Sequence, residues 1–272
     1  MSPDLKTPNP ASKSLHAGVV QFDVKTGDTA ANLDQALAGI NALAEADVEV
    51  AVLPELWSGG FHDNVAADAA DTPAILEKLA ATAAARRMVI AGSMAEATGL
   101  GIYNTLYVHD SDGTLAGQYR KVHLFTATAE DRSFLAGDQC RICQTSAGVF
   151  GLVVCYDIRF PEFCLSLALK GADGLIVCAE WPASRIHHWE ALLCARAIEN
   201  QLFVVAANRC GRDASILYGG RSQIVTATGT VAASAGDTES TVIHAILDRS
   251  EQERFRTAIP SLKERRPDVY GL

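Results

Sequence analysis

An apolar run that ends at a cysteine constrains this chain more than any other feature. Residues 149–154 are almost all apolar, Cys155 follows them directly, and Pro161 stands six positions further on. A short apolar run of this kind predicts a buried strand, and proline is favoured at the first position of a helix. The segment therefore predicts a strand, a sharp turn and a helix, with the thiol at the turn.

A thiol in that position lies at the edge of a sheet and faces the N-terminal end of a helix, which suits a reactive thiolate. An arbitrary cysteine is more often an apolar core residue. Two other segments favour the reactive interpretation: Glu55 follows an apolar run at 48–53, and Lys121 follows a β-like run at 115–119. Because α/β proteins assemble their sites at strand ends, a base, a cation and a nucleophile are expected together.

Strand-like and helix-like segments alternate along the chain. Strands are expected at residues 19–22, 48–53, 88–93, 104–109, 115–119, 149–154, 175–178, 202–207, 222–226, 230–233 and 242–247, and helices at 30–46, 73–87, 161–170, 186–200 and just after Arg249. Turn signals at 110–113 and 227–229 predict two hairpins. This alternation predicts a single α/β domain with helices on both sides of sheet material. A doubly wound single sheet would fit the same periodicity.

Composition limits the class of protein. The 272 residues are 49% hydrophobic and carry a net charge of −9, which argues against nucleic acid as the main partner. Residues 1–14 are expected to form a flexible N-terminal arm rather than a signal peptide, with one domain at 15–272. No apolar run is long enough to span a membrane. Seven cysteines scattered through apolar segments predict a reducing, cytoplasmic location.

The sequence predicts neither a metal nor a cofactor. Cys140 and Cys143 form a CxxC pair, but no second pair or suitable histidine pair stands nearby, and a structural zinc needs four ligands. His187 and His188 are adjacent rather than four residues apart, so they do not point together from one helix face.

Several motifs, taken in order, resemble those of the nitrilase, or carbon–nitrogen hydrolase, superfamily. They are residues 53–55, 119–125, 155–162, 188–189, 195–201 and 265–271. The resemblance covers roughly residues 15–271, and it implies a four-layer α-β-β-α sandwich in a single domain. It also implies a homodimer in which the C-terminal tail crosses the neighbouring subunit.

The chemistry of three residues predicts an amidase mechanism. Cys155 attacks an amide carbonyl and forms a thioester. Glu55 takes the thiol proton, passes it to the leaving nitrogen and later activates water. Lys121 stabilises the oxyanion together with the backbone N–H of Tyr156. The ammonium is also expected to lower the pKa of the thiol.

The resemblance points to four further site residues. Glu130 matches a second glutamate that orients the substrate or Lys121. The alternative is a solvated loop carboxylate, but the functional role is favoured because a second carboxylate would help to hold Lys121 charged. Tyr156 and Trp181 are expected to line the pocket. Arg159 has two interpretations: it binds a substrate carboxylate, or it pairs with Glu162 or Asp157 and holds the turn. The resemblance favours the second, because this arginine often occurs in the family whatever the substrate.

The substrate is expected to be a short primary amide with a carboxylate at its far end. Trp181, Pro182 and the helix after them resemble ω-amidases, whereas residues 155–162 and 265–268 equally resemble deaminated-glutathione amidases. Hydrolysis of carbamoyl groups is a third possibility. In a protein of net charge −9, an anionic substrate needs a local cation, for which Arg159 and Arg185 are candidates. Two alternatives of another kind are a catalytically silent scaffold and a subunit that supplies ammonia to a synthetase. The intact Glu, Lys and Cys set argues against the scaffold.

Overall fold

Two six-stranded sheets form the centre of the molecule. The computed structural model describes residues 13–270. The first sheet contains, in spatial order, β12 (Thr241–Asp248), β1 (Ser14–Gln21), β2 (Val50–Val52), β3 (Val89–Ala97), β4 (Ile102–His109) and β5 (Leu115–Arg120). The second contains β11 (Val231–Ser234), β10 (Gln223–Val225), β9 (Phe203–Asn208), β8 (Gly174–Ala179), β7 (Gly148–Val154) and β6 (Ile142–Thr145).

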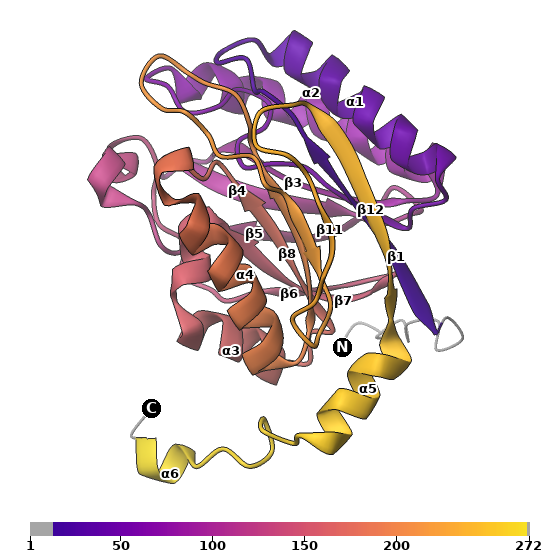
Figure 1. Cartoon of the computed structure of the whole chain (residues 1–272). Coiled ribbons are helices and arrows are strands. Elements are labelled where there is room, and N and C mark those ends of the chain that lie inside the picture. The colour runs from indigo at the N-terminus through magenta and orange to yellow at the C-terminus, as the bar shows by residue number, and fades with distance from the viewer. Residues whose placement is uncertain (1–12, 271–272) are drawn as a thin grey trace, which may run out of the picture.

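Each sheet is covered on its outer face by a pair of helices. Helices α1 (Thr29–Glu45) and α2 (Val65–Arg86) pack on the first sheet, and α3 (Pro161–Leu169) and α4 (Ile186–Asn200) pack on the second. The inner faces of the sheets pack against each other, with β1 on β9 and β5 beside β6 (Figure 1). The four-layer α-β-β-α sandwich is therefore confirmed, and the single doubly wound sheet is wrong.

The three central strands of each sheet are parallel. In the first sheet β1, β2 and β3 run parallel, and in the second β7, β8 and β9 do so. Such strands are buried on both faces, and every residue of β2, β8 and β9 is indeed buried. Because these strands are parallel, their carboxyl ends lie at one edge of each sheet, where the loops that follow can meet.

Several element boundaries differ from the sequence-based expectation, most of all the starts of α2 and β1. Helix α2 begins at Val65 rather than at residue 73, and Pro73 lies inside it. The helix extends past the proline because its N-terminal turns bury Val65 and Ala69, so packing compensates the lost backbone hydrogen bond. Strand β1 begins at Ser14, within the expected N-terminal arm, and the rest of that arm, residues 1–12, lies outside the described residues.

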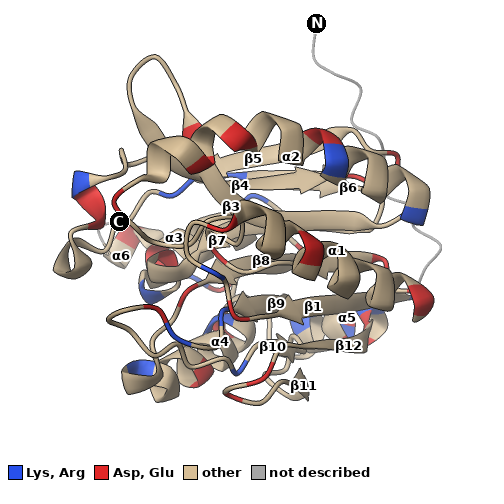
Figure 2. Ribbon diagram, turned by 90° about the horizontal axis from the view of Figure 1, so that it is seen from above, with Lys and Arg blue, Asp and Glu red and all other residues tan. Residues whose placement is uncertain are grey.

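The C-terminal segment extends away from the sandwich. Helix α5 (Arg249–Ala258) follows β12, and the short helix α6 (Pro267–Tyr270) lies further out (Figure 1). Ile259, Val269 and Tyr270 are all more than half exposed along this segment. Figure 2 shows acidic and basic positions interspersed along helices and loops, so the net negative charge is not gathered on one element.

Candidate active site

Four strand ends deliver the polar groups of one buried site. Glu55 follows β2, Lys121 follows β5, Cys155 follows β7 and Glu180 follows β8. The first two come from one sheet and the last two from the other, so the site lies where the two sheets meet. All four residues line the same cavity, of about 520 Å³. The structure therefore brings together Glu55, Lys121 and Cys155, as the sequence predicted.

The nucleophile candidate sits on a strained turn. Cys155 has a φ of +45°, in the left-handed region that side chains other than glycine seldom adopt. It begins a 3-10 turn, Cys155–Arg159, which leads to α3 at Pro161. Such strain persists only where neighbouring contacts hold the backbone. The strand, turn and helix match the sequence prediction.

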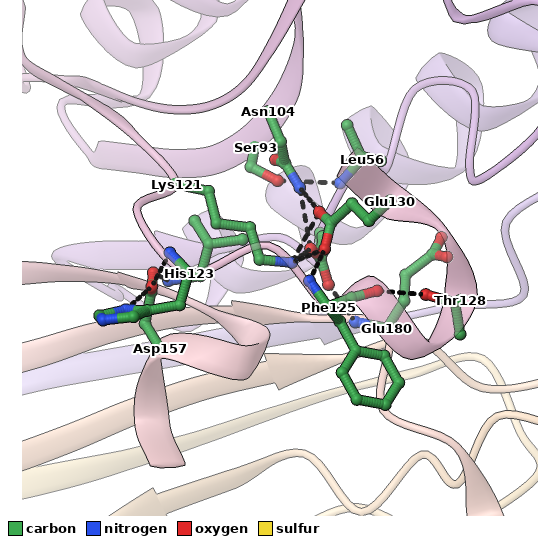
Figure 3. A network of polar contacts seen from close by, with 12 residues as sticks. Leu56, Ser93, Asn104, Lys121, His123, Phe125, Thr128, Glu130, Asp157 and Glu180 are labelled. Carbon is green, nitrogen blue, oxygen red and sulfur yellow. Dashed lines mark hydrogen bonds and ion pairs between the residues drawn. The ribbon is translucent and has the colours of Figure 1, made fainter. Parts of the chain in front are cut away.

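The buried carboxylate of Asp157 provides those contacts. Its Oδ2 accepts hydrogen bonds from the backbone N–H of Val154 at 3.0 Å and from the Tyr119 hydroxyl at 2.8 Å. Its Oδ1 accepts the backbone N–H of His123 at 3.0 Å and lies 2.8 Å from Nδ1 of the same residue (Figure 3). One carboxylate thus ties the cysteine turn to the loop that carries Lys121.

A lysine lies between two carboxylates at the centre of the site. The Lys121 ammonium donates to Oε1 of Glu55 at 2.8 Å and to both carboxylate oxygens of Glu130, at 2.8 and 2.9 Å. The three side chains are each 1% exposed. Glu130 also accepts the backbone N–H of Phe125 at 2.7 Å (Figure 3). The solvated-loop interpretation of Glu130 is therefore wrong.

Two hydrogen bonds orient the Glu55 carboxylate further. The Asn104 side-chain amide, from β4, donates to Oε1 at 2.8 Å, and the backbone N–H of Glu180 donates to Oε2 at 3.0 Å. Sequence reasoning missed both residues. Glu180 carried a signal, because it is a charged residue directly after the apolar residues 175–179 and directly before Trp181. Asn104 lies within a strand, and nothing in the neighbouring sequence marked it as a site residue.

Burial and neighbouring charges set the protonation of the cluster. Burial opposes the charge on Lys121, but Glu55 and Glu130 outweigh it and hold the pKa of Lys121 well above its usual value. For Glu130, burial raises the pKa, Lys121 opposes that rise and Glu55 adds to it. The ammonium therefore stays charged between the two carboxyl groups.

The resting thiol is protonated, contrary to the sequence prediction of a low pKa. Cys155 is partly exposed to the cavity but otherwise enclosed by protein, so burial raises the pKa of its thiol. The Glu55 carboxylate raises it further, and Lys121 lowers it only in part. Since the thiolate is not preformed, the nearby carboxylate is needed to accept the proton as the sulfur attacks.

Aromatic and cationic side chains form the cavity wall. Tyr156 and Trp181 both line the cavity, as expected. Arg159 lies over the Trp181 ring at 4.5 Å, and Arg185 lies over the Phe125 ring at 5.4 Å. Both arginines line the cavity as well.

Arg159 does not hold the cysteine turn through a carboxylate. Its guanidinium lies 3.3 Å from Nδ1 of His188, whereas Asp157 is occupied by the contacts described above. The predicted pairing of Arg159 with Glu162 or Asp157 is therefore wrong. Among residues 13–270, neither Arg159 nor Arg185 forms an ion pair with a carboxylate. The wall thus presents two unpaired guanidinium groups to the cavity.

The remaining sequence candidates lie elsewhere. Cys143 lies in β6 and Cys140 just before it; both are free thiols, and Lys170 donates to the Cys140 carbonyl. In the described part of the chain, no three metal-ligating side chains come together, and no helix is long and apolar enough to cross a membrane.

The fold and the site define a family of enzymes. The model of the family described as carbon–nitrogen hydrolase matches residues 16–257. The chain therefore belongs to the carbon–nitrogen hydrolase family, and it is a hydrolase that acts on carbon–nitrogen bonds.

Curated relatives narrow the class to amidases. The chain is 35% identical to a 2-oxoglutaramate amidase of Bacillus subtilis, over 92% of this chain and 97% of that protein. It is 31% identical to a chloroplastic omega-amidase of Arabidopsis thaliana, over 98% of this chain and 77% of that protein.

Solved structures share the fold. A carbon–nitrogen hydrolase from Helicobacter pylori superposes with a TM-score of 0.90 at 26% identity, over 95% of this chain and 97% of the other. Nit3 of Saccharomyces cerevisiae, a nitrilase superfamily member, superposes with a TM-score of 0.86 at 29% identity, over 94% and 97%.

Proposed function

We propose that this chain hydrolyses a short primary amide bearing a carboxylate, releasing ammonia and the acid through a thioester on Cys155. One observation carries the proposal. A strained thiol shares a cavity with a lysine held between two buried carboxylates, and two unpaired arginines line the wall of that cavity. The site thus has a nucleophile, a proton acceptor, a fixed positive charge and an anchor for an anion.

In the first half of the reaction, Glu55 accepts the thiol proton while the sulfur attacks the amide carbon. The carbon–oxygen double bond opens to an oxyanion, which Lys121 and the backbone N–H of Tyr156 stabilise. When the carbon–nitrogen bond breaks, Glu55 returns the proton to the nitrogen and ammonia leaves. The carboxylate thus starts and ends this half-reaction ionised, and the acyl group remains on Cys155.

In the second half, Glu55 removes a proton from water while the water oxygen attacks the thioester. The carbon–sulfur bond breaks, and the proton passes to the sulfur, which restores the thiol. Glu130 acts as a positioning residue, because its two oxygens fix the Lys121 ammonium at 2.8 and 2.9 Å.

The anionic end of the substrate is assigned to Arg159 and Arg185. Burying a carboxylate without a cation is costly, and these guanidinium groups have no competing carboxylate among the described residues. The names of the relatives support a 2-oxo acid amide such as 2-oxoglutaramate. Deaminated glutathione and carbamoyl compounds are the competing substrates, and the catalytically silent scaffold is disfavoured by the complete site.

We also propose a cytoplasmic homodimer with one domain per subunit, spanning residues 15–272. Seven free thiols suit a reducing compartment. The C-terminal segment carries Ile259, Val269 and Tyr270 exposed away from the sandwich, which supports contact with a second copy.

The test is an ammonia-release screen of the purified protein over short ω-amides, carbamoyl amines and nitriles. The carboxylated ω-amides should turn over fastest. Cys155→Ala should abolish ammonia release, whereas Cys140→Ala, at a thiol outside the cavity, should leave it unchanged. Release of ammonia by a folded Cys155→Ala protein at the wild-type rate would refute the assignment.

A further inference from the structure

Glu180 is a buried carboxyl group in the cavity wall that the mechanism above does not use. The residue is 5% exposed and lines the cavity with Cys155 and Lys121. Its backbone N–H donates to Glu55 at 3.0 Å, so this residue is fixed beside the proposed proton acceptor.

One oxygen of this carboxyl is firmly held. Oε1 of Glu180 accepts a hydrogen bond from Nη1 of Arg209 at 3.0 Å, and both side chains are 0% exposed. Arg209 is anchored in turn, because its Nη2 donates to the Val24 carbonyl at 2.7 Å and its guanidinium lies 4.1 Å from the centre of the Tyr218 ring. Arg209 therefore fixes the orientation of the Glu180 carboxyl group.

The other oxygen has no partner. Oε2 of Glu180 is buried and forms no hydrogen bond within residues 13–270. A buried polar atom without a partner costs about 1–3 kcal/mol, so such atoms are usually met by a ligand or by water. In a residue that lines a substrate cavity, a group on the substrate can meet this need.

We propose that Glu180 is a specificity-determining residue, whose Oε2 carries a proton and donates a hydrogen bond to an acceptor oxygen on the acyl chain of the substrate, such as a 2-oxo group. The proposal rests on the amidase function proposed above and names the feature of the substrate that this part of the cavity recognises.

The surroundings favour a neutral carboxyl group at Glu180. Burial raises its pKa, Arg209 opposes this, Glu55 raises it again and Tyr218 lowers it, with a net result of about 7. The other ionisable groups packed around it are Tyr218 and Asp213 in the loop after β9 and Asp23 after β1, which lies 4.0 Å from Arg209. A neutral acid also avoids repelling the anionic substrate, and a buried carboxylic acid can serve as a hydrogen-bond donor.

Tyr218 is the competing acceptor. Its hydroxyl donates to Oδ2 of Asp213 at 2.6 Å, and its interaction with Glu180 lowers the pKa of that carboxyl group. A substitution that removes the Tyr218 hydroxyl therefore distinguishes a hydrogen bond between Glu180 and the substrate from one between Glu180 and Tyr218.

Glu180→Gln is an informative variant because Arg209 fixes its orientation. Nη1 of Arg209 can only donate, so the glutamine oxygen faces Arg209 and the amide NH₂ takes the place of Oε2. The variant is therefore a permanent donor that does not titrate. Glu77→Gln, at an exposed position of α2, is the matched control.

The experiment measures kcat/KM from pH 6 to pH 8.5 for two four-carbon amides, 2-oxosuccinamate and succinamate. In the first, closure of the amide nitrogen onto the 2-oxo carbon would need a strained four-membered ring. In the wild type and in Glu77→Gln, the ratio of kcat/KM for 2-oxosuccinamate to kcat/KM for succinamate should fall about tenfold as the pH rises through 7. A fall of this size corresponds to the loss of one hydrogen bond. In Glu180→Gln the ratio should stay high throughout. Dividing wild-type by variant values at each pH removes effects of the substrate's own solution chemistry.

A ratio that does not change with pH in the wild type, or one that falls equally in Glu180→Gln, overturns the inference. Tyr218→Phe should keep the wild-type fall, and loss of the fall in this variant would make Tyr218 the partner and also overturn it. If Glu180→Gln does not fold, the pH dependence of the ratio in the wild type and in Tyr218→Phe still tests the inference. Absence of turnover of either amide contradicts the proposed function instead, so the two failures are distinct.

Discussion

Nζ of Lys121 lies 2.8 Å from Oε1 of Glu55, with both side chains 1% exposed. With Glu130 on the other side of the ammonium, two carboxylates share a single cation in a site closed to solvent. A buried charge is stable only when it is paired. The cluster therefore couples catalysis to stability, because both carboxyl groups hold the ammonium charged and the ammonium offsets the repulsion between them.

Glu55→Gln should change the pH dependence of the reaction as well as its rate. Without the proton acceptor, the rate should fall about 10²–10⁴-fold at neutral pH. Because burial raises the pKa of the Cys155 thiol and persists in this variant, the residual rate should depend on the small thiolate fraction. It should then rise by up to about tenfold per pH unit below the thiol pKa. Ammonia release measured from pH 6 to pH 9 checks this, and a flat profile for the variant would contradict the role of Glu55.

Lys121→Met should lose activity and also stability. Removal of an oxyanion donor should slow turnover about 10²–10³-fold. Loss of the cation leaves Glu55 and Glu130 unpaired, which should lower the free energy of unfolding by about 3–5 kcal/mol at pH 8.

The sign of the pH effect in this variant follows from the carboxyl groups. Without Lys121, their pKa values in the folded state should exceed those of the unfolded chain, so the folded protein binds protons more tightly. The stability deficit should therefore shrink as the pH falls from 8 to 5. Urea unfolding at both pH values measures it, with Lys78→Met on exposed α2 as the control. An equal deficit at pH 5 and pH 8 would be inconsistent with two unpaired carboxylates.

Arg159→Gln and Arg185→Gln should act mainly on KM, and mainly for carboxylated amides. A charge-assisted hydrogen bond contributes about 1.5–3 kcal/mol, so KM should rise about 10- to 100-fold for a carboxylated ω-amide and little for a neutral amide of the same length. Steady-state kinetics with the matched pair of substrates gives the answer. Arg86→Gln, exposed on α2, serves as the control, and equal effects on both amides would rule out an anion anchor.

Asp157→Asn should disturb the cysteine turn. The carboxylate receives hydrogen bonds at both oxygens from three residues, and an amide offers only one oxygen. The free energy of unfolding should fall by about 2–4 kcal/mol. Turnover should fall about 10²-fold, because the thiol moves relative to Lys121. Asp34→Asn, exposed on α1, is the control, and unchanged kcat in the Asp157 variant would exclude a positioning role.

Local patterns in the sequence predicted most of the strands and helices, and the strand ends at which the site residues lie. The apolar run before Cys155 and the proline after its turn are enough to specify strand, turn and helix, because burial and proline geometry act within a few residues. The same logic predicted the strands before Glu55 and Lys121. The start of α2 was missed because Pro73 looks like a helix start, while the packing of Val65 and Ala69 against other elements is invisible in a local pattern.

Tertiary structure decided what periodicity cannot encode. A buried strand has the same apolar pattern whether it belongs to one wide sheet or to two packed sheets, so only the pairing of distant strands separates the two folds. The contacts of Asn104 and Glu180 with Glu55 join residues 49 and 125 positions apart. The protonated state of the thiol likewise depends on enclosure by both sheets. The sequence by itself determined which groups are present and at which strand ends. Long-range packing determined their distances, their partners and their charges, because these depend on side chains that meet only in the folded chain.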